Sequence, residues 1–304
     1  MEDMKPEFGR KDDIRKLKGI LEKINDDRTV IMAPEYGDSK KKSRPNKLRV
    51  YSHGGRILYL STTGGANNEV FPDKKYRPAS NAAGIPTGNV SYEILNEQNL
   101  RGMIGIAENR AKGEVETSKT YLERSVETRL IKKHRDDKYG NGIIVDMEFS
   151  TPENWMGQIA SYNGITKRGK PDLVIYDPET ESFGLVELKY KNKSCQNMEK
   201  HFADFYNIIH GGYAEDLIIE FRRKMLYLEA YGIIDEVKHF NLDNALKRPM
   251  WNAFLFVGGC ADSCHKSFES TIVDSKYIDK RDVGFLYIPD EETKIDYSKR
   301  SFFS

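Results

Sequence analysis

The segment at residues 170–193 (KPDLVIYDPETESFGLVELKYKNK) constrains the fold of this chain more than any other stretch. Two apolar runs, residues 173–176 and residues 183–186, flank six residues that favour turns, residues 177–182. Apolar runs that are separated by such a polar cluster are typical of a β-hairpin. The sequence therefore predicts two paired strands joined by a short turn.

Charged side chains gather at the open end of this predicted hairpin. Because side chains alternate along a strand, Glu187 and Lys189 project to one side and Leu188 to the other. A register that brings Asp172 opposite would place two carboxylates and one ammonium group together. Carboxylate oxygens are ligands of hard divalent cations. The segment therefore predicts a site that binds such a cation and activates water.

The composition favours a protein that buries its own core. The chain has 304 residues, which is enough for one large domain or two modest ones. Hydrophobic residues make up 38% of it and charged residues 31%, which indicates a soluble protein. The formal net charge is only +1, so any surface that binds nucleic acid has to be a local basic patch.

The sequence also bears on compartment and redox state. No apolar run approaches the length that spans a bilayer, and the first residues (MEDMKPEFGRKDD) lack the apolar region of a secretory signal. We therefore expect a cytoplasmic protein with no membrane partner. Its three cysteines predict no disulfide framework. Cys260, Cys264 and His265 lie close together in sequence, but no second ligand pair follows, so we predict no zinc or iron–sulfur site.

Residues 1–112 read as an N-terminal accessory region. Apolar residues at helical spacing predict an amphipathic helix at residues 14–24. A short strand is expected at residues 29–32 and a small β-hairpin at residues 48–62. Residues 63–90 are rich in Gly, Asn, Ala and Pro without periodicity, which predicts a long loop.

The rest of the chain alternates between helical and strand patterns. A helix is expected from residue 92 to residue 104, with a break at Gly113. The elements expected after it are a helix at 117–134, a strand at 143–149, the hairpin, helices at 197–209 and 214–231, and strands at 253–257 and 283–288. This order predicts an α/β or α+β unit with a mixed sheet.

The residues at the open end of the hairpin carry a family resemblance. Pro171 and Asp172, followed by Glu187-Leu188-Lys189 at the end of the next strand, resemble the signature of the PD-(D/E)xK nuclease superfamily. That superfamily includes restriction endonucleases, Holliday-junction resolvases and RecB-type nucleases. Its core has the same order of elements, helix–strand–strand–strand–helix–strand, that we expect between residues 116 and 257.

The resemblance implies a fold and an activity. Residues 113–304 would form a nuclease-like domain with a restriction-endonuclease-like or resolvase-like core. The activity would be Mg²⁺-dependent hydrolysis of phosphodiester bonds, with Mn²⁺ as a substitute, and DNA is the expected partner because most of the family acts on DNA. Whether the chain acts as a monomer or a homodimer stays open, as does exonuclease against endonuclease action.

The resemblance also assigns roles to residues. Asp172 and Glu187 would bind the cation together with the carbonyl of Leu188, and Lys189 would orient the attacking water and stabilise developing charge. The family places a further glutamate on the helix before the first strand. Glu123 and Glu127 lie one helical turn apart, and we prefer Glu127, which precedes the apolar pair Leu130-Ile131. The alternative for either glutamate is a surface ion pair with Arg129 or Lys132.

Basic residues flank the acidic centre in the sequence. They are expected to contact phosphates and to give affinity that weakens with salt, and they are Lys167, Arg168, Lys170, Lys191 and Lys193. His201, on the predicted helix that follows the hairpin, is a candidate for reaching the cation site or a phosphate. A histidine there also fits a packing or capping role.

Two other classes of function compete with a nuclease. The first is a non-catalytic protein that binds nucleic acid or acts as a scaffold and retains the nuclease fold. The presence of Asp172, Glu187 and Lys189 disfavours it, since loss of one of them would be its simplest sign. The second is an enzyme acting on small molecules, but the sequence contains no Gly-rich phosphate loop and no nucleophile elbow.

Overall fold

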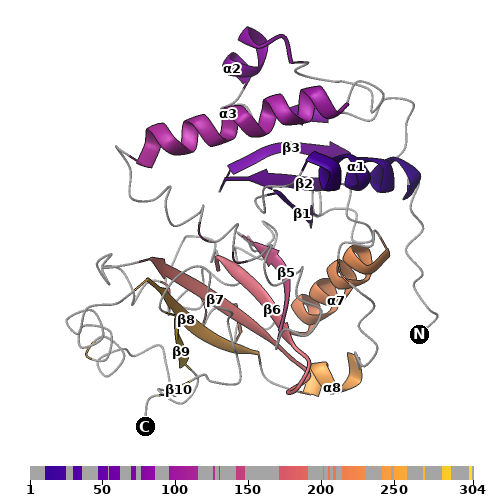
Figure 1. Ribbon diagram of the computed structural model, residues 1–304. Coiled ribbons are helices and arrows are strands. Elements are labelled where there is room, and N and C mark those ends of the chain that lie inside the picture. The colour runs from indigo at the N-terminus through magenta and orange to yellow at the C-terminus, as the bar shows by residue number, and fades with distance from the viewer. Residues whose placement is uncertain are drawn as a thin grey trace, which may run out of the picture. The chain divides into compact units, whose positions relative to one another are not determined.

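A computed structural model of the chain shows two compact units (Figure 1). One unit comprises Met1–Asp136 and Lys224–Glu236, and the other comprises Asp137–Arg223 and Val237–Ser304. The structure describes residues 11–24, 30–35, 47–53, 55–61, 70–72, 77–85, 96–115, 126, 130, 142–147, 171–190, 201, 205, 208–209, 214–230, 234, 242–247, 250–258, 270, 283–288 and 301–302. Our division of the chain after residue 112 stays a prediction.

The first unit contains a four-stranded antiparallel sheet with the order β1-β2-β3-β4. Its strands are β1 (Val30–Glu35), β2 (Lys47–Ser52), β3 (Gly55–Ser61) and β4 (Val70–Pro72). Helix α3 (Glu97–Val115) packs against β2 and β3, and α1 (Lys11–Ile24) and α2 (Arg77–Ala82) contact α3 (Figure 1). The predicted first helix, first strand and small hairpin are thereby confirmed.

Local sequence explains these elements. In α1, Leu17 and Ile24 are buried whereas Arg15, Lys16 and Lys23 are exposed, which is the pattern of an amphipathic helix. The first turn of α3 is capped by Asn96, whose Oδ1 accepts a hydrogen bond of 2.9 Å from the backbone N–H of Asn99.

Two of our predictions for this unit are wrong. Residues 63–90 are not only a loop, because they include β4 and α2. Both elements are too short for a periodic pattern, and pairing with β3 and contact with α3 stabilise them. The helix predicted to break at Gly113 runs on to Val115. A glycine inside a helix costs only about 1 kcal/mol, which the rest of the helix offsets.

The second unit contains a six-stranded mixed sheet with the order β10-β9-β8-β7-β6-β5. The antiparallel part consists of β5 (Ile143–Met147), β6 (Leu173–Asp177) and β7 (Ser182–Tyr190). Strands β8 (Trp251–Val257) and β9 (Val283–Ile288) continue parallel to β7, and β10 (Ser301–Phe302) pairs antiparallel with β9. The predicted mixed α/β architecture is confirmed, as are the hairpin and the strands expected around it.

Helices add to this sheet from two places in the sequence. Helix α7 (Ala214–Ala230) confirms the long helix that we predict, and the division between the units falls within it. The ring of its Phe221 lies 5.5 Å from the ring of Phe183 on β7, centroid to centroid, and Phe183 in turn contacts Tyr176 on β6. The short helix α8 (Leu242–Lys247) also contacts β7, and the sequence analysis did not predict it.

Two further predicted helices lie mostly outside the described residues. Of the helix expected at residues 117–134, the structure describes Val126 and Leu130, which are both helical and buried. Of the helix expected at residues 197–209, it describes four residues, and all four are helical: His201, Phe205, Ile208 and Ile209. Among the described helices, none has the length and apolar character needed to cross a bilayer.

Candidate active site at the open end of the hairpin

The candidate site exists because β7 is longer than its partner β6. The antiparallel pairing runs from Asp177 opposite Ser182 to Leu173 opposite Val186, where β6 begins. Strand β7 continues for four more residues to Tyr190, and β8 stays paired with it in parallel along this extension. The extension is therefore held on one side by β8 and is open on the side where Asp172 precedes β6.

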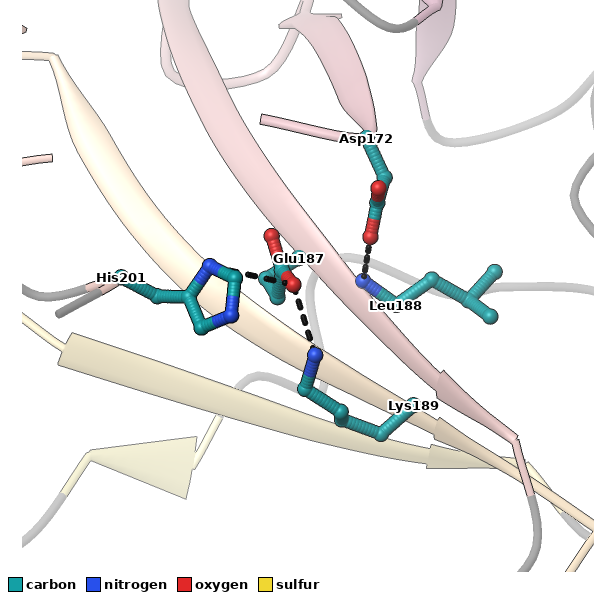
Figure 2. A network of polar contacts seen from close by, with 5 residues as sticks. All are labelled: Asp172, Glu187, Leu188, Lys189 and His201. Atoms are coloured by element: carbon teal, nitrogen blue, oxygen red, sulfur yellow. Dashed lines mark hydrogen bonds and ion pairs between the residues drawn. The ribbon is translucent and has the colours of Figure 1, made fainter. Parts of the chain in front are cut away.

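The carboxylate of Asp172 lies on that open side. Its Oδ2 accepts a hydrogen bond of 2.7 Å from the backbone N–H of Leu188 (Figure 2). In a strand, the N–H and the C=O of one residue point to the same neighbour. The carbonyl of Leu188 is therefore directed to the same side as Asp172, in the direction that its predicted role as a cation ligand requires.

Glu187 lies at the centre of the candidate site. Only 4% of the residue is exposed. Its Oε1 accepts a hydrogen bond of 2.6 Å from Nζ of Lys189 and lies 3.2 Å from Nδ1 of His201 (Figure 2). Its Oε2 is buried and has no hydrogen-bond partner among the described residues. One oxygen of this carboxylate is thus held by two cationic or polar side chains, and the other is left without a donor.

The charges around Glu187 keep its carboxylate ionised. Burial by itself raises the pKa of Glu187, because it disfavours the charged form. The hydrogen bond from His201 and the positive charge of Lys189 act in the opposite direction and outweigh burial. The pKa of Glu187 is therefore below its ordinary value, and the side chain is an anion at neutral pH.

The structure brings together five of the residues that the sequence predicts, as Figure 2 shows: Asp172, Glu187, Leu188, Lys189 and His201. The predicted helix glutamate, Glu127 or its alternative Glu123, lies outside the described residues. So do the basic residues that flank the acidic centre in the sequence, here called the basic rim: Lys167, Arg168, Lys170, Lys191 and Lys193. Their roles stay predictions.

His201 lies at the candidate site through a contact with Glu187. Reaching the cation site is one of the two roles for which His201 is a candidate, and its Nδ1 lies 3.2 Å from Oε1 of Glu187. A contact of His201 with a phosphate stays a prediction. A signal for the contact with Glu187 was present in the sequence. Phe205 and Ile208, four and seven residues further on, are both buried, so His201 begins a helical face that is turned to the protein interior.

The donor set fits a hard divalent cation in part. Within the described residues, no group of three or more His, Cys, Asp and Glu side chains is close enough to hold a metal ion. Mg²⁺, however, keeps several water ligands and is commonly bound through one or two carboxylates. The buried Oε2 of Glu187 has no donor in the described part of the chain, and a cation would satisfy it.

Comparison with known proteins leaves the site chemistry as the guide to function. No family model, no curated protein and no solved structure matches this chain.

Proposed function

We propose that this protein is a metal-dependent nuclease of the PD-(D/E)xK type that hydrolyses phosphodiester bonds in DNA. The observation that carries the proposal is the carboxylate of Glu187, which is buried and ionised and has one oxygen for which no described residue provides a donor. A buried anionic oxygen of this kind costs free energy unless it is satisfied, and a divalent cation satisfies it. Lys189 and Asp172 accompany it at the same end of the hairpin.

The order and direction of the strands support the proposed restriction-endonuclease-like core. An antiparallel meander, β5 to β7, is followed by helix α7 and by β8, which lies parallel to β7. That is the strand part of the order expected from the resemblance. The support for this core therefore rests on the strands and on α7.

The roles of the residues follow from their chemistry. Asp172, Glu187 and the carbonyl of Leu188 would hold the cation. When bound, Mg²⁺ supplies a Lewis acid that lowers the pKa of water and neutralises charge on phosphoryl oxygens. Lys189 would orient the attacking water and donate to the oxygens on which negative charge develops. The predicted basic rim would hold the DNA backbone without reading its sequence.

The ammonium of Lys189 is suited to this role by its surroundings. Its side chain is only 11% exposed, and its Nζ is 2.6 Å from Oε1 of Glu187. A nearly buried ammonium acts in a medium of lower dielectric than water. Its interaction with a phosphoryl group would therefore be stronger than that of a lysine in water.

The direct test is cleavage by the purified protein of plasmid, single-stranded and branched DNA with Mg²⁺, Mn²⁺ or EDTA. The proposal expects cleavage with Mg²⁺ and Mn²⁺ that EDTA abolishes and that is lost in Asp172→Ala, with the fold of the variant checked by circular dichroism. Cleavage that is unchanged in Asp172→Ala would contradict the proposed site. Binding of DNA without cleavage in any cation would select the alternative, a non-catalytic protein that binds nucleic acid.

A further inference from the structure

We propose that His201 is a positioning residue, which holds the carboxylate of Glu187 so that Oε2 is presented to a divalent cation of the Mg²⁺ or Mn²⁺ class. This inference rests on the proposed function and adds to it a residue outside the family signature. It assigns the contact between Nδ1 of His201 and Oε1 of Glu187, at 3.2 Å, a role in cation affinity.

The two donors on Oε1 act from different parts of the chain. Lys189 belongs to the same strand as Glu187 and reaches it by a flexible four-carbon side chain at 2.6 Å. His201 belongs to the helical segment that follows the hairpin and approaches the same oxygen separately (Figure 2). The carboxylate cannot rotate about its last side-chain bond without losing both hydrogen bonds, so its orientation is fixed.

The imidazole is itself held in place. Phe205 and Ile208 are each 1% exposed and lie on the same helical face as His201, so they anchor this segment in the protein interior. The His201 side chain remains 28% exposed, which places it at the edge of the buried region. A ring on an anchored helix is a better fixed point for a carboxylate than an ammonium on a long side chain.

Loss of the imidazole would change what Glu187 presents. With only Lys189 left, the carboxylate could turn part of the way until the ammonium donates to both of its oxygens, so that Oε2 would also be engaged by Lys189. That arrangement would compete with a cation for the same oxygen. The expected consequence of removing His201 is therefore weaker binding of the cation, with the fold intact.

The test measures Mn²⁺ binding to the full chain by isothermal titration calorimetry without nucleic acid. His201→Ala is expected to raise the Kd for Mn²⁺ by about 10- to 100-fold, the usual effect of removing a residue that orients a metal ligand. His201→Asn is expected to retain most of the affinity, because its amide nitrogen can take the place of Nδ1. Asn244→Ala is the matched control, since it deletes a hydrogen bond of 2.6 Å to Glu181 at the other end of the same hairpin.

Each outcome decides between roles. Equal Mn²⁺ affinity in wild type and His201→Ala would overturn the positioning role and leave the proposed nuclease intact. Equal losses in His201→Ala and His201→Asn would also overturn it, and would indicate that the imidazole itself binds the cation. DNA binding in EDTA is a separate measurement. If His201→Ala lowers the affinity for DNA but leaves the affinity for Mn²⁺ unchanged, His201 contacts a phosphate. A wild-type protein that binds no Mn²⁺ and cleaves no DNA would overturn both proposals.

Discussion

The two ends of the β6–β7 hairpin carry carboxylates in opposite situations. At the turn, Oδ1 of the buried Asp177 accepts hydrogen bonds from the backbone N–H groups of Glu179, at 3.0 Å, and Thr180, at 3.5 Å. Glu181 at the same turn accepts a hydrogen bond from Asn244 of α8. At the open end, Glu187 has two donors on one oxygen and none among the described residues on the other.

This difference separates a structural use of a carboxylate from a functional one. The turn satisfies its acids with nearby backbone and amide groups, which stabilises a chain reversal that includes a left-handed residue, Glu181, with a φ of 52°. At the open end, Oε2 of Glu187 is buried with no donor from the residues that the structure describes, and such a group costs about 1–3 kcal/mol of stability. Among the described carboxylates of this hairpin, the contrast with Asp177 and Glu181 makes Oε2 of Glu187 the oxygen that is expected to serve a function.

The largest effect is expected at the open end of the hairpin, on the rate of DNA cleavage. Lys189→Ala is expected to lower the rate of Mg²⁺-dependent DNA cleavage by about 100- to 1000-fold, which is typical of removing one donor that stabilises transition-state charge. Single-turnover cleavage of a labelled duplex measures this rate. Asn244→Ala, which removes a donor at the turn end, is the matched control, and an equal loss of rate in both variants would contradict a specific role for Lys189.

A smaller effect is expected at the turn. Asp177→Ala removes the acceptor of two backbone N–H groups and is expected to lower the free energy of unfolding by about 1 kcal/mol. Urea unfolding followed by circular dichroism measures this change. Cleavage per folded molecule should stay at the wild-type rate, and a large loss of rate at full stability would show that the turn takes part in function.

The smallest expected effect is on the pH dependence of stability, which differs between the two ends of the hairpin. The pKa of Glu187 is lower in the folded protein, so the folded state binds fewer protons than the unfolded state as the medium becomes acidic. Its contribution to stability is present above the ordinary glutamate pKa of about 4.3 and is lost as the pH falls through the lowered value. Glu187→Gln should not show this loss of stability at acid pH.

A loss of stability at alkaline pH is expected from the turn end of the hairpin. Burial raises the pKa of Tyr176 to about 12, so the folded state keeps a proton that the unfolded state has released. Stability is expected to fall as the pH rises above the ordinary tyrosine pKa of about 10, by less than about 1 kcal/mol at half a unit above it. Urea unfolding across the pH range measures the loss of stability at acid pH and at alkaline pH. Tyr176→Phe should reduce only the loss at alkaline pH.

Much of the fold could be read from the sequence because its strands are marked by local patterns. The hairpin, β5, β8 and β9 follow from apolar runs bounded by turn residues, and α1 and α7 follow from helical spacing. The short elements β4, α2, α8 and β10 could not be read, since they have two to six residues each and depend on their neighbours. In α3, the other residues of a long helix offset the free-energy cost of Gly113, so this glycine does not end the helix.

The candidate site divides in the same way. The sequence by itself determined that Glu187 and Lys189 share a face of one strand, because alternation is a local property of the backbone. Only the tertiary structure decided that the carboxylate of Asp172 bonds the N–H of Leu188, sixteen residues away, and that His201 contacts Glu187 from another segment. Those contacts depend on where β6 begins relative to β7 and on how a helix packs, and both are set by long-range burial that no spacing in the sequence records.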